Sequence, residues 1–350
     1  MAYTDIDNPE LYFQTKIWSG NGGTQAITFD GSENMQPDWV WIKRRNDTNG
    51  HTVLDSVRGA TKSWRADATE AEETRASSLT SFDSNGFTLG SDGNVNASGG
   101  TYVAWNWKAG TSVSGNTTGS GTAKAYSGSV NTDAGFSIIK YVGNGTSGHT
   151  IPHHLTVAPN VIITKVLNET SSAYVYHSGI GATKNLFLSE GDAAGTSAAY
   201  WANTAPSSSV FTVGDQTGNN GNSKNIIAYC FADIKGYSKF GSYTGNGNAD
   251  GPMIVTGMKP AWLMIKRSST GGDDWMMTDN KMNLFNVINK RLNPNSNGAE
   301  QSTDIIDFVS NGFKLRATPD YMNGSGSTYI YMAFAENPFV TSTGVPATAR

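Results

Sequence analysis

The sequence is poor in cysteine, in charged residues and in long apolar runs, and each shortage excludes a class of protein. Cys230 is the only cysteine among 350 residues, so an intrachain disulfide and a cysteine-rich zinc site are both excluded. Only 15% of the residues are charged, and 25 basic against 29 acidic side chains leave a net charge of −4. This balance offers no electrostatic footprint for nucleic acid or for an anionic membrane.

Signals for export, membrane insertion and common catalytic mechanisms are also missing. Residues 1–5 have neither the basic nor the apolar region of a signal peptide, and no run of about 18 apolar residues occurs. There is no Gly-x-Ser-x-Gly elbow, phosphate-binding loop or His-Glu-x-x-His motif. We therefore expect a soluble protein, made in a cytoplasm, that is not an enzyme and carries no cofactor.

Glycine, threonine, serine and asparagine are abundant instead. The chain has 40 Gly, 37 Thr, 36 Ser and 32 Asn, a mixture that favours turns and short strands over helices. Its 9 Trp, 14 Tyr and 14 Phe supply large buriable surfaces that disordered chains lack. The composition therefore predicts a folded, all-β protein.

Four landmarks recur three times along the chain, in the same order and at near-constant spacing. They are a Gly-Asn-Gly turn (20–22, 143–145, 245–247), an apolar strand ending in lysine (Lys43, Lys165, Lys266), a phenylalanine strand (Phe87, Phe211, Phe313) and an aromatic strand (102–107, 226–231, 331–335). Such self-similarity indicates repeated structural units. We predict three tandem homologous domains of about 100 residues each.

Within each repeat, short strands rich in Val, Ile, Trp, Tyr and Phe alternate with Gly, Asn and Ser turns. This pattern is typical of an antiparallel β-sandwich or jelly roll. The predicted divisions are an N-terminal docking arm (1–15), a first repeat (16–110), a flexible Gly/Ser/Thr-rich linker (111–132), a second repeat (133–236), a third repeat (237–338) and a C-terminal tail (339–350). The apolar residues expected to dock the arm onto another protein are Tyr3, Leu11, Tyr12 and Phe13.

The repeated lysines are the most suggestive polar residues. Lys43 follows Trp39 and Trp41 on one face of its strand. An acid comes twelve or thirteen residues after the lysine in two repeats, and a histidine takes that place in the second; these residues are Asp55, Asp279 and His177. A structural Lys–Asp pair at the sandwich rim is the favoured interpretation. The alternative is that Lys43, Lys165 and Lys266 contact a ligand or partner at the surface.

Further candidate sites rest on weaker patterns. Trp201 and Trp275 lie in irregular context and are candidates for exposed rings that stack on sugars. Residues 246–251 begin like a calcium loop, but Gly257 stands where a bidentate glutamate is needed. His153 and His154 are adjacent, so on a strand their side chains point to opposite faces. We therefore predict no metal site, and we expect Cys230 to be a core residue.

A set of short stretches carries a family resemblance. They include PDWVWIK at residues 37–43, DSVRG at 55–59 and YVAWNW at 102–107. Further stretches are residues 12–16, 81–87, 236–240, 333–339 and 348–350. Together they resemble a repeat common in virion proteins of marine tailed bacteriophages, and the resemblance covers nearly the whole chain. The second repeat departs from the pattern, because it has His177 and Ser178 where DSVRG begins.

Members of that family are described as tail, fibre or other structural components, and the repeat is similar to concanavalin-like (laminin G or SPRY-like) sandwiches. The resemblance implies a non-enzymatic virion protein, associated with the tail or a tail fibre, that contributes to adhesion to host-surface glycan. Other virion proteins and further copies of the chain are the implied partners, with a trimer expected by analogy with phage fibres. Two alternatives stay open: a capsid decoration or head-fibre protein with an architectural role, and a glycan-cleaving depolymerase, which needs two carboxylates converging in a cleft.

Overall fold

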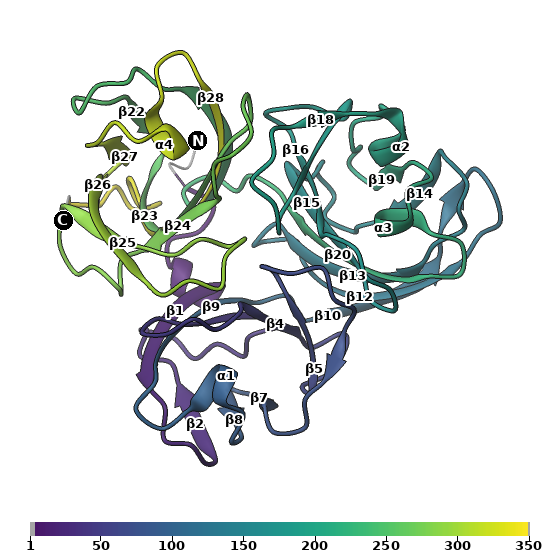
Figure 1. Cartoon of the computed structure of the whole chain (residues 1–350), viewed down its shortest axis with the longest axis horizontal. Helices are drawn as coiled ribbons and strands as arrows, with labels where there is room; N and C mark the ends of the chain where they lie inside the picture. The colour runs from purple at the N-terminus through teal and green to yellow at the C-terminus, as the bar shows by residue number, and fades with distance from the viewer. Residues whose placement is uncertain (1–3, 349–350) are drawn as a thin grey trace.

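The computed structural model describes residues 4–348, and in Figure 1 these form three lobes around a common centre. Lobe 1 is residues 13–107, lobe 2 is residues 111–231 and lobe 3 is residues 238–338. Each lobe consists of two antiparallel sheets, and the helices are single turns. The prediction of an all-β fold is confirmed. Among the described residues, no helix has the length and apolar character needed to cross a bilayer.

Lobe 1 pairs a six-stranded sheet with a three-stranded sheet. Across the larger sheet the strands are β1 (Phe13–Ser19), β9 (Thr101–Trp107), β3 (Trp39–Arg44), β4 (Thr52–Asp55), β5 (Lys62–Arg65) and β6 (Glu73–Thr74). The smaller sheet contains β2 (Gln25–Thr28), β8 (Gly86–Leu89) and β7 (Leu79–Asp83). The 3-10 turn η1 (Pro9–Leu11) precedes β1, and Asn8 caps it by accepting the Glu10 amide on Oδ1 at 3.1 Å.

Lobe 2 repeats this order and extends it. Its large sheet runs β10 (Thr111–Asn116), β12 (Ala125–Asn131), β13 (Phe136–Val142), β20 (Asn225–Phe231), β15 (Val161–Val166), β16 (Tyr174–His177), β17 (Lys184–Phe187) and β18 (Gly195–Thr196). The small sheet is β11 (Thr118–Gly119), β14 (His149–Pro152) and β19 (Val210–Val213). Strands β10 and β12 are an addition relative to lobe 1, because they lie outside β13, which corresponds to β1.

Lobe 3 has two four-stranded sheets. One runs β21 (Ser238–Thr244), β28 (Thr328–Pro338), β23 (Met258–Arg267) and β24 (Met276–Asp279), and the other runs β22 (Met253–Val255), β27 (Gly312–Leu315), β26 (Gln301–Val309) and β25 (Ile288–Arg291). The single-turn helices of the three lobes are α1 (Gly93–Asn96), α2 (Ala198–Trp201), α3 (Thr217–Asn220) and α4 (Asp320–Asn323).

Alternation along the lysine-ending strands explains how the lobes assemble. Strand β3 is buried on both faces, because Val40 and Ile42 enter the core between the sheets of lobe 1, whereas Trp39 and Trp41 face the centre of the molecule. Strands β15 and β23 divide their side chains between two cores in the same way. Each large sheet therefore serves one core inside its lobe and a second core that it shares.

The shared core is rich in aromatic rings and lies between all three lobes. Trp107, Phe231 and Phe334 come from equivalent positions of β9, β20 and β28, and their ring centroids are 5.5 to 6.3 Å apart. Such distances are those of favourable aromatic pairs. The lobes are thus not separate modules in series, since each buries one face against the other two. The homology of the repeats and the predicted bounds of the three repeats (16–110, 133–236 and 237–338) stay predictions.

The predicted flexible linker at residues 111–132 is wrong. Strand β10 pairs with β12 over its whole length, and β12 pairs in turn with β13. The mistake has a physical cause: nearly every residue of β10 is exposed, so an edge strand with two wet faces needs no apolar alternation. Its serine and glycine content therefore resembles that of a linker.

The predicted docking arm is also wrong for the described residues, and Tyr3 lies outside them. Thr4 is buried and donates a hydrogen bond from Oγ1 to the Lys235 carbonyl at 3.0 Å, beside the connection between lobes 2 and 3. Leu11 and Tyr12 are half-buried, and Phe13 belongs to β1 and stacks on Phe334 with centroids 5.4 Å apart. The buried residues of this segment thus attach lobe 1 to lobe 3, and the segment is part of the fold.

The chain that follows lobe 3, predicted as a C-terminal tail, returns to the same region. The Phe339 amide donates to the Gly257 carbonyl at 3.2 Å, and Val340 forms a bridge with Pro346. The Ser342 amide donates to Asp7 Oδ1 at 2.6 Å. Within the described residues, the first and last segments of the chain therefore contact each other.

A buried asparagine explains the repeated Gly-Asn-Gly turn. Asn96, Asn220 and Asn323 end α1, α3 and α4, and each accepts the backbone N–H of the turn asparagine on Oδ1 at 2.9 to 3.0 Å. The first glycine of the turn lies so close that a Cβ on Gly143 would stand 2.4 Å from the Gly221 carbonyl oxygen. The turn therefore requires both the glycine and the distant asparagine, which the sequence analysis did not identify.

We expect Asn220→Ala to lower the free energy of unfolding by about 2 kcal/mol, because it leaves buried backbone groups without partners. Asn220 Nδ2 donates to the Gly214 carbonyl at 2.6 Å and to the Thr146 carbonyl at 2.9 Å. Urea unfolding followed by tryptophan fluorescence measures the change. Asn222→Ala, two residues along at an exposed position, is the matched control and should change stability by less than about 0.5 kcal/mol. Equal effects of the two substitutions would contradict the assigned role.

Candidate functional site

The three repeated lysines are fully buried and lie at the junctions between lobes. Lys43 Nζ donates to the Asn297 carbonyl of lobe 3 at 3.3 Å. Lys165 Nζ donates to the Thr69 carbonyl of lobe 1 at 2.9 Å, and Lys266 Nζ donates to the Gly191 carbonyl of lobe 2 at 2.9 Å. All three acceptors lie on the corresponding loop of the neighbouring lobe, so the contacts form a closed cycle.

Each lysine also donates to a carbonyl of its own lobe; these acceptors are Arg44, Ser171 and Asp273. Burial lowers the pKa of Lys43, Lys165 and Lys266 to about 8, which still leaves the ammonium form dominant at neutral pH. The alternative interpretation, in which these lysines contact a ligand or partner at the surface, is wrong, because the lobes cover them.

The predicted Lys–Asp pair does not form. Asp55 lies opposite Trp39 in the β3–β4 pair, four positions from Lys43 along β3, or about 13 Å. The stretch from Lys43 to Asp55 includes the turn of the β3–β4 hairpin, so Asp55 lies beside the first residue of β3, whereas Lys43 lies near its last. Asp55 Oδ2 instead accepts from Arg58 Nε at 2.5 Å and from the Tyr229 hydroxyl of lobe 2 at 2.7 Å.

Asp279 and His177 occupy the position of Asp55 in lobes 3 and 2, and they form hydrogen bonds across the other two junctions. Asp279 of lobe 3 accepts from Trp105 Nε1 of lobe 1 at 2.8 Å, and its complete burial raises the pKa of the carboxyl group. His177 of lobe 2 places Nε2 at 3.1 Å from the Tyr331 carbonyl oxygen of lobe 3. Lobe 3 has Met332 where the other lobes have Trp105 or Tyr229, so this junction lacks a side-chain donor and the histidine donates to backbone.

Trp201 and Trp275 are buried as well, so the prediction of exposed, sugar-stacking rings is wrong. Trp201 Nε1 donates to Asn185 Oδ1 at 3.2 Å inside lobe 2. Trp275 Nε1 donates to the Phe187 carbonyl at 3.0 Å and so links lobe 3 to lobe 2. Both indoles are structural, because each satisfies its N–H within the fold.

The other candidate groups have structural partners. Asp250, in the loop that begins like a calcium site, forms an ion pair with Lys314 at 2.7 Å. His153 is buried, with Nε2 3.1 Å from the Ser207 carbonyl oxygen, and Cys230 is a core residue whose pKa burial raises to about 12. Within residues 4–348, no three His, Cys, Asp or Glu side chains are placed to hold a metal ion.

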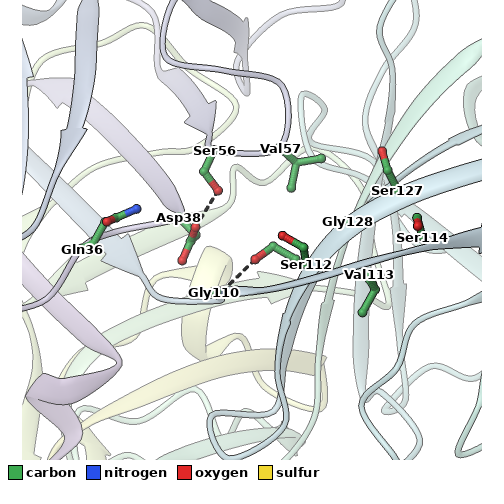
Figure 2. A pocket seen from close by; sticks show the side chains of 11 residues that line it. Gln36, Asp38, Ser56, Val57, Gly110, Ser112, Val113, Ser114, Ser127 and Gly128 are labelled. Carbon is green, nitrogen blue, oxygen red and sulfur yellow. Dashed lines mark hydrogen bonds between the residues drawn. The ribbon is translucent and has the colours of Figure 1, made fainter.

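A groove of about 530 Å³ lies between lobes 1 and 2, and we call it the serine groove. Its lining residues are Gln36, Asp38, Ser56, Val57, Gly110, Ser112, Val113, Ser114, Ser127, Gly128 and Ser129. Figure 2 shows Ser56 and Asp38 of lobe 1 on one side, and Ser112, Ser114 and Ser127 of lobe 2 on the other. The side chains that line it are predominantly hydroxyl groups.

Strand pairing sets the positions of these hydroxyls. In the β10–β12 pair, Ser112 lies opposite Ser129 and Ser114 lies opposite Ser127, so the four side chains share one face of the sheet. Asp38 Oδ1 accepts from Ser56 Oγ at 2.6 Å, and Oδ2 accepts from the Ala109 amide at 2.9 Å. Burial raises the pKa of Asp38. The groove thus combines a fixed carboxyl group with a regular array of hydroxyls.

The equivalent places at the other two junctions differ. Between lobes 2 and 3, a groove of about 510 Å³ is lined by Lys184, Ser242, Thr244, Ser268 and other residues. Between lobes 3 and 1, the space is only about 30 Å³, and Glu10, Lys281 and Glu336 border it. Sequence reasoning missed the serine groove because its strands were assigned to a linker. The available signal was serine at alternate positions, 112 and 114, then 127 and 129.

Neither a search of curated proteins nor a search of solved structures found a similar chain. Residues 8–338 match the model of a family described as a domain of unknown function, DUF7483, and this range runs through all three lobes. The chain belongs to the DUF7483 family.

Proposed function

We propose that the chain is a non-enzymatic structural protein of a bacteriophage particle, associated with the tail or a tail fibre. The observation that carries the proposal is that the repeated polar residues form hydrogen bonds between lobes. Lys43, Lys165 and Lys266 donate to neighbouring lobes, and the residues at the Asp55 position join the same lobes a second time. Side chains that recur in every lobe therefore hold the lobes together.

The shared core supports the same proposal. A particle outside a cell depends on slow unfolding, because an unfolded component cannot be replaced. Aromatic rings from all three lobes meet in the centre, so one lobe cannot open without exposing large apolar surfaces of the other two. Resistance to local opening suits a permanent part of an assembly.

The sequence resemblance supplies the setting. It favours assembly in a bacterial cytoplasm, a final location in the virion, and contacts with other virion proteins and further copies of the chain. Adhesion to host-surface glycan belongs to the same proposal.

Locating the chain in purified particles tests the proposal. We expect mass spectrometry of gradient-purified virions to detect the chain, and immunogold labelling with an antibody against it to mark the tail or its fibres. An antibody against the major capsid protein is the control for labelling of the head. Label confined to the head would replace the tail assignment by capsid decoration, and absence of the chain from the particles would overturn the proposal.

A further inference from the structure

We propose that the serine groove between lobes 1 and 2 binds a neutral saccharide. This inference deepens the proposed function and rests on it for the biological role of binding, because it assigns the adhesive contact to a defined surface. Three observations support it: the register of the serine hydroxyls, the fixed carboxyl group of Asp38 and the shape of the groove.

The hydroxyl array matches the chemistry of a sugar. Ser112, Ser114 and Ser127 are exposed, and each hydroxyl has one donor and two acceptor positions. Sugar hydroxyls have the same dual character, so either partner can donate. Ser129 is held at the base, where its Oγ accepts the Gly110 amide at 2.7 Å and keeps its own proton for donation.

Asp38 gives the groove an acceptor of fixed orientation. Its two oxygens are held by Ser56 and by the Ala109 amide, and each retains a lone pair for a further donor. A carboxylate that accepts from hydroxyl groups makes stronger bonds than a neutral acceptor does. Asp38 is the only ionisable side chain among the lining residues, so a ligand carrying its own carboxylates would be repelled. The electrostatics therefore favour a neutral sugar over a uronic acid.

The shape of the groove fits a ligand of this kind. Val57 adds a small apolar surface, which suits the C–H groups of a pyranose ring, whereas the Val113 side chain lies on the other face of β10 and packs toward the core of lobe 2. Gly110 has no side chain, and a Cβ there would meet nothing within 4 Å, so a ligand can approach the backbone closely at this point. A volume of about 530 Å³ is within the usual range of small-molecule sites.

Saccharide binding can be measured on the full chain by saturation-transfer NMR. Maltotriose, α-1,6-linked mannotriose and triacetylchitotriose, each at about 10 mM, are the neutral probes, and trigalacturonate is the acidic probe. We expect saturation transfer to at least one neutral trisaccharide and none to trigalacturonate. Transfer to none of the three neutral probes, or equal transfer to trigalacturonate, overturns the inference.

Variants then test whether the groove is the place of binding. The double substitution Ser112→Ala and Ser127→Ala removes two exposed hydroxyls and should weaken binding of the responding trisaccharide at least tenfold. Thr28→Ala removes an exposed hydroxyl from β2, which belongs to the smaller sheet of lobe 1 and does not line the groove, and is the matched control with unchanged affinity expected. Unchanged thermal unfolding of both variants shows that they are folded. Unaltered affinity of the double variant overturns the inference.

Failure of this inference and failure of the proposed function give different results. If the chain is found in the virion but the groove does not bind neutral sugars, the structural role stands and the assigned adhesive surface is wrong. If the groove binds sugar but the chain is absent from the virion, the binding site stands and the proposed function is wrong.

Discussion

Replacing Asp55 by alanine is expected to lower the free energy of unfolding by about 3–5 kcal/mol, the range for breaking a buried ion pair by removal of one partner. The side chains of Asp55 and Arg58 are 0% and 1% exposed. Burial acts to lower the pKa of Arg58, but Asp55 and Glu72 outweigh it and hold the pKa above its usual value. Without Asp55 the guanidinium stays charged and keeps only Glu72, at 3.1 Å, as a counter-ion.

The loss extends beyond the ion pair, because Asp55 belongs to the junction of lobes 1 and 2. The Tyr229 hydroxyl would lose its acceptor, and the Arg58 amide would lose the Oδ1 bond of 2.9 Å. Tyr229→Phe removes the bond to Asp55 and the bond of 3.1 Å that Trp64 Nε1 donates to the same hydroxyl, and it should cost about 2 kcal/mol. Comparison of the two variants by urea unfolding separates the charge effect from the hydrogen bonds that Tyr229 makes across the junction.

A surface ion pair provides the control for Asp55→Ala. Asp47 lies 3.2 Å from Arg44 Nη1 with half of its side chain exposed, so Asp47→Ala should change stability by less than about 1 kcal/mol. If Asp55→Ala proved no more harmful than Asp47→Ala, the buried network would not be what holds lobes 1 and 2 together.

The second large effect is expected on acidification, and three buried histidines cause it. His51, His153 and His177 share one arrangement: Nδ1 accepts an N–H, from Trp41, Leu155 and Gly179 respectively, and Nε2 faces a carbonyl oxygen. Both ring nitrogens are therefore satisfied by the neutral ring, and a second proton on Nδ1 would meet a donor. Burial lowers the pKa to about 3 for His51 and to about 4 for His153 and His177.

The direction of the pH effect follows from proton binding. Between the unfolded pKa of about 6.5 and the folded pKa, the unfolded chain binds more protons at these sites than the folded chain does. The histidines therefore contribute stability above about pH 6.5 and lose that contribution as the pH falls toward 4. Each should steepen the fall in the free energy of unfolding by up to about 1.4 kcal/mol per pH unit.

His177→Gln tests this expectation at the junction of lobes 2 and 3. Glutamine does not titrate, so the slope of stability against pH between 6.5 and 4 should become shallower than in the parent protein. His154→Gln is the control, because His154 is only half-buried and should contribute little to the slope. An unchanged slope in His177→Gln would show that the ring is not held neutral in the folded protein.

The face of the sheet to which a side chain points could be predicted from the sequence, because it depends on one strand alone. The alternation of Trp39 and Trp41 with Val40 and Ile42 is visible in the sequence. In the structure, the two tryptophans enter the shared core, and Val40 and Ile42 enter the core of lobe 1. The residues that cover Trp39 and Trp41 could not be predicted from this strand, because they belong to other lobes. The mistaken exposure of Trp275 has the same origin, since its indole N–H finds a carbonyl of lobe 2.

The candidate site shows a different limit. A spacing of twelve residues from Lys43 to Asp55 suggested a pair, but the hairpin between β3 and β4 makes sequence distance a poor guide to register. The role of the buried Asn220 could not be predicted, because nothing in the local sequence indicates its hydrogen bond with the distant Asn144. The composition of β10 concealed a strand, since an exposed edge carries no hydrophobic pattern.

The differences among the three junction grooves have a consequence for how such a molecule can specialise. In a closed ring of three identical polypeptides, rotational symmetry repeats each substitution at every interface. A single continuous chain is free of that constraint, so one crevice can stay open, of about 530 Å³, while its counterpart between lobes 3 and 1 shrinks to about 30 Å³. Asymmetry of this kind lets the seam between lobes 1 and 2 change its lining residues without any matching change between lobes 3 and 1.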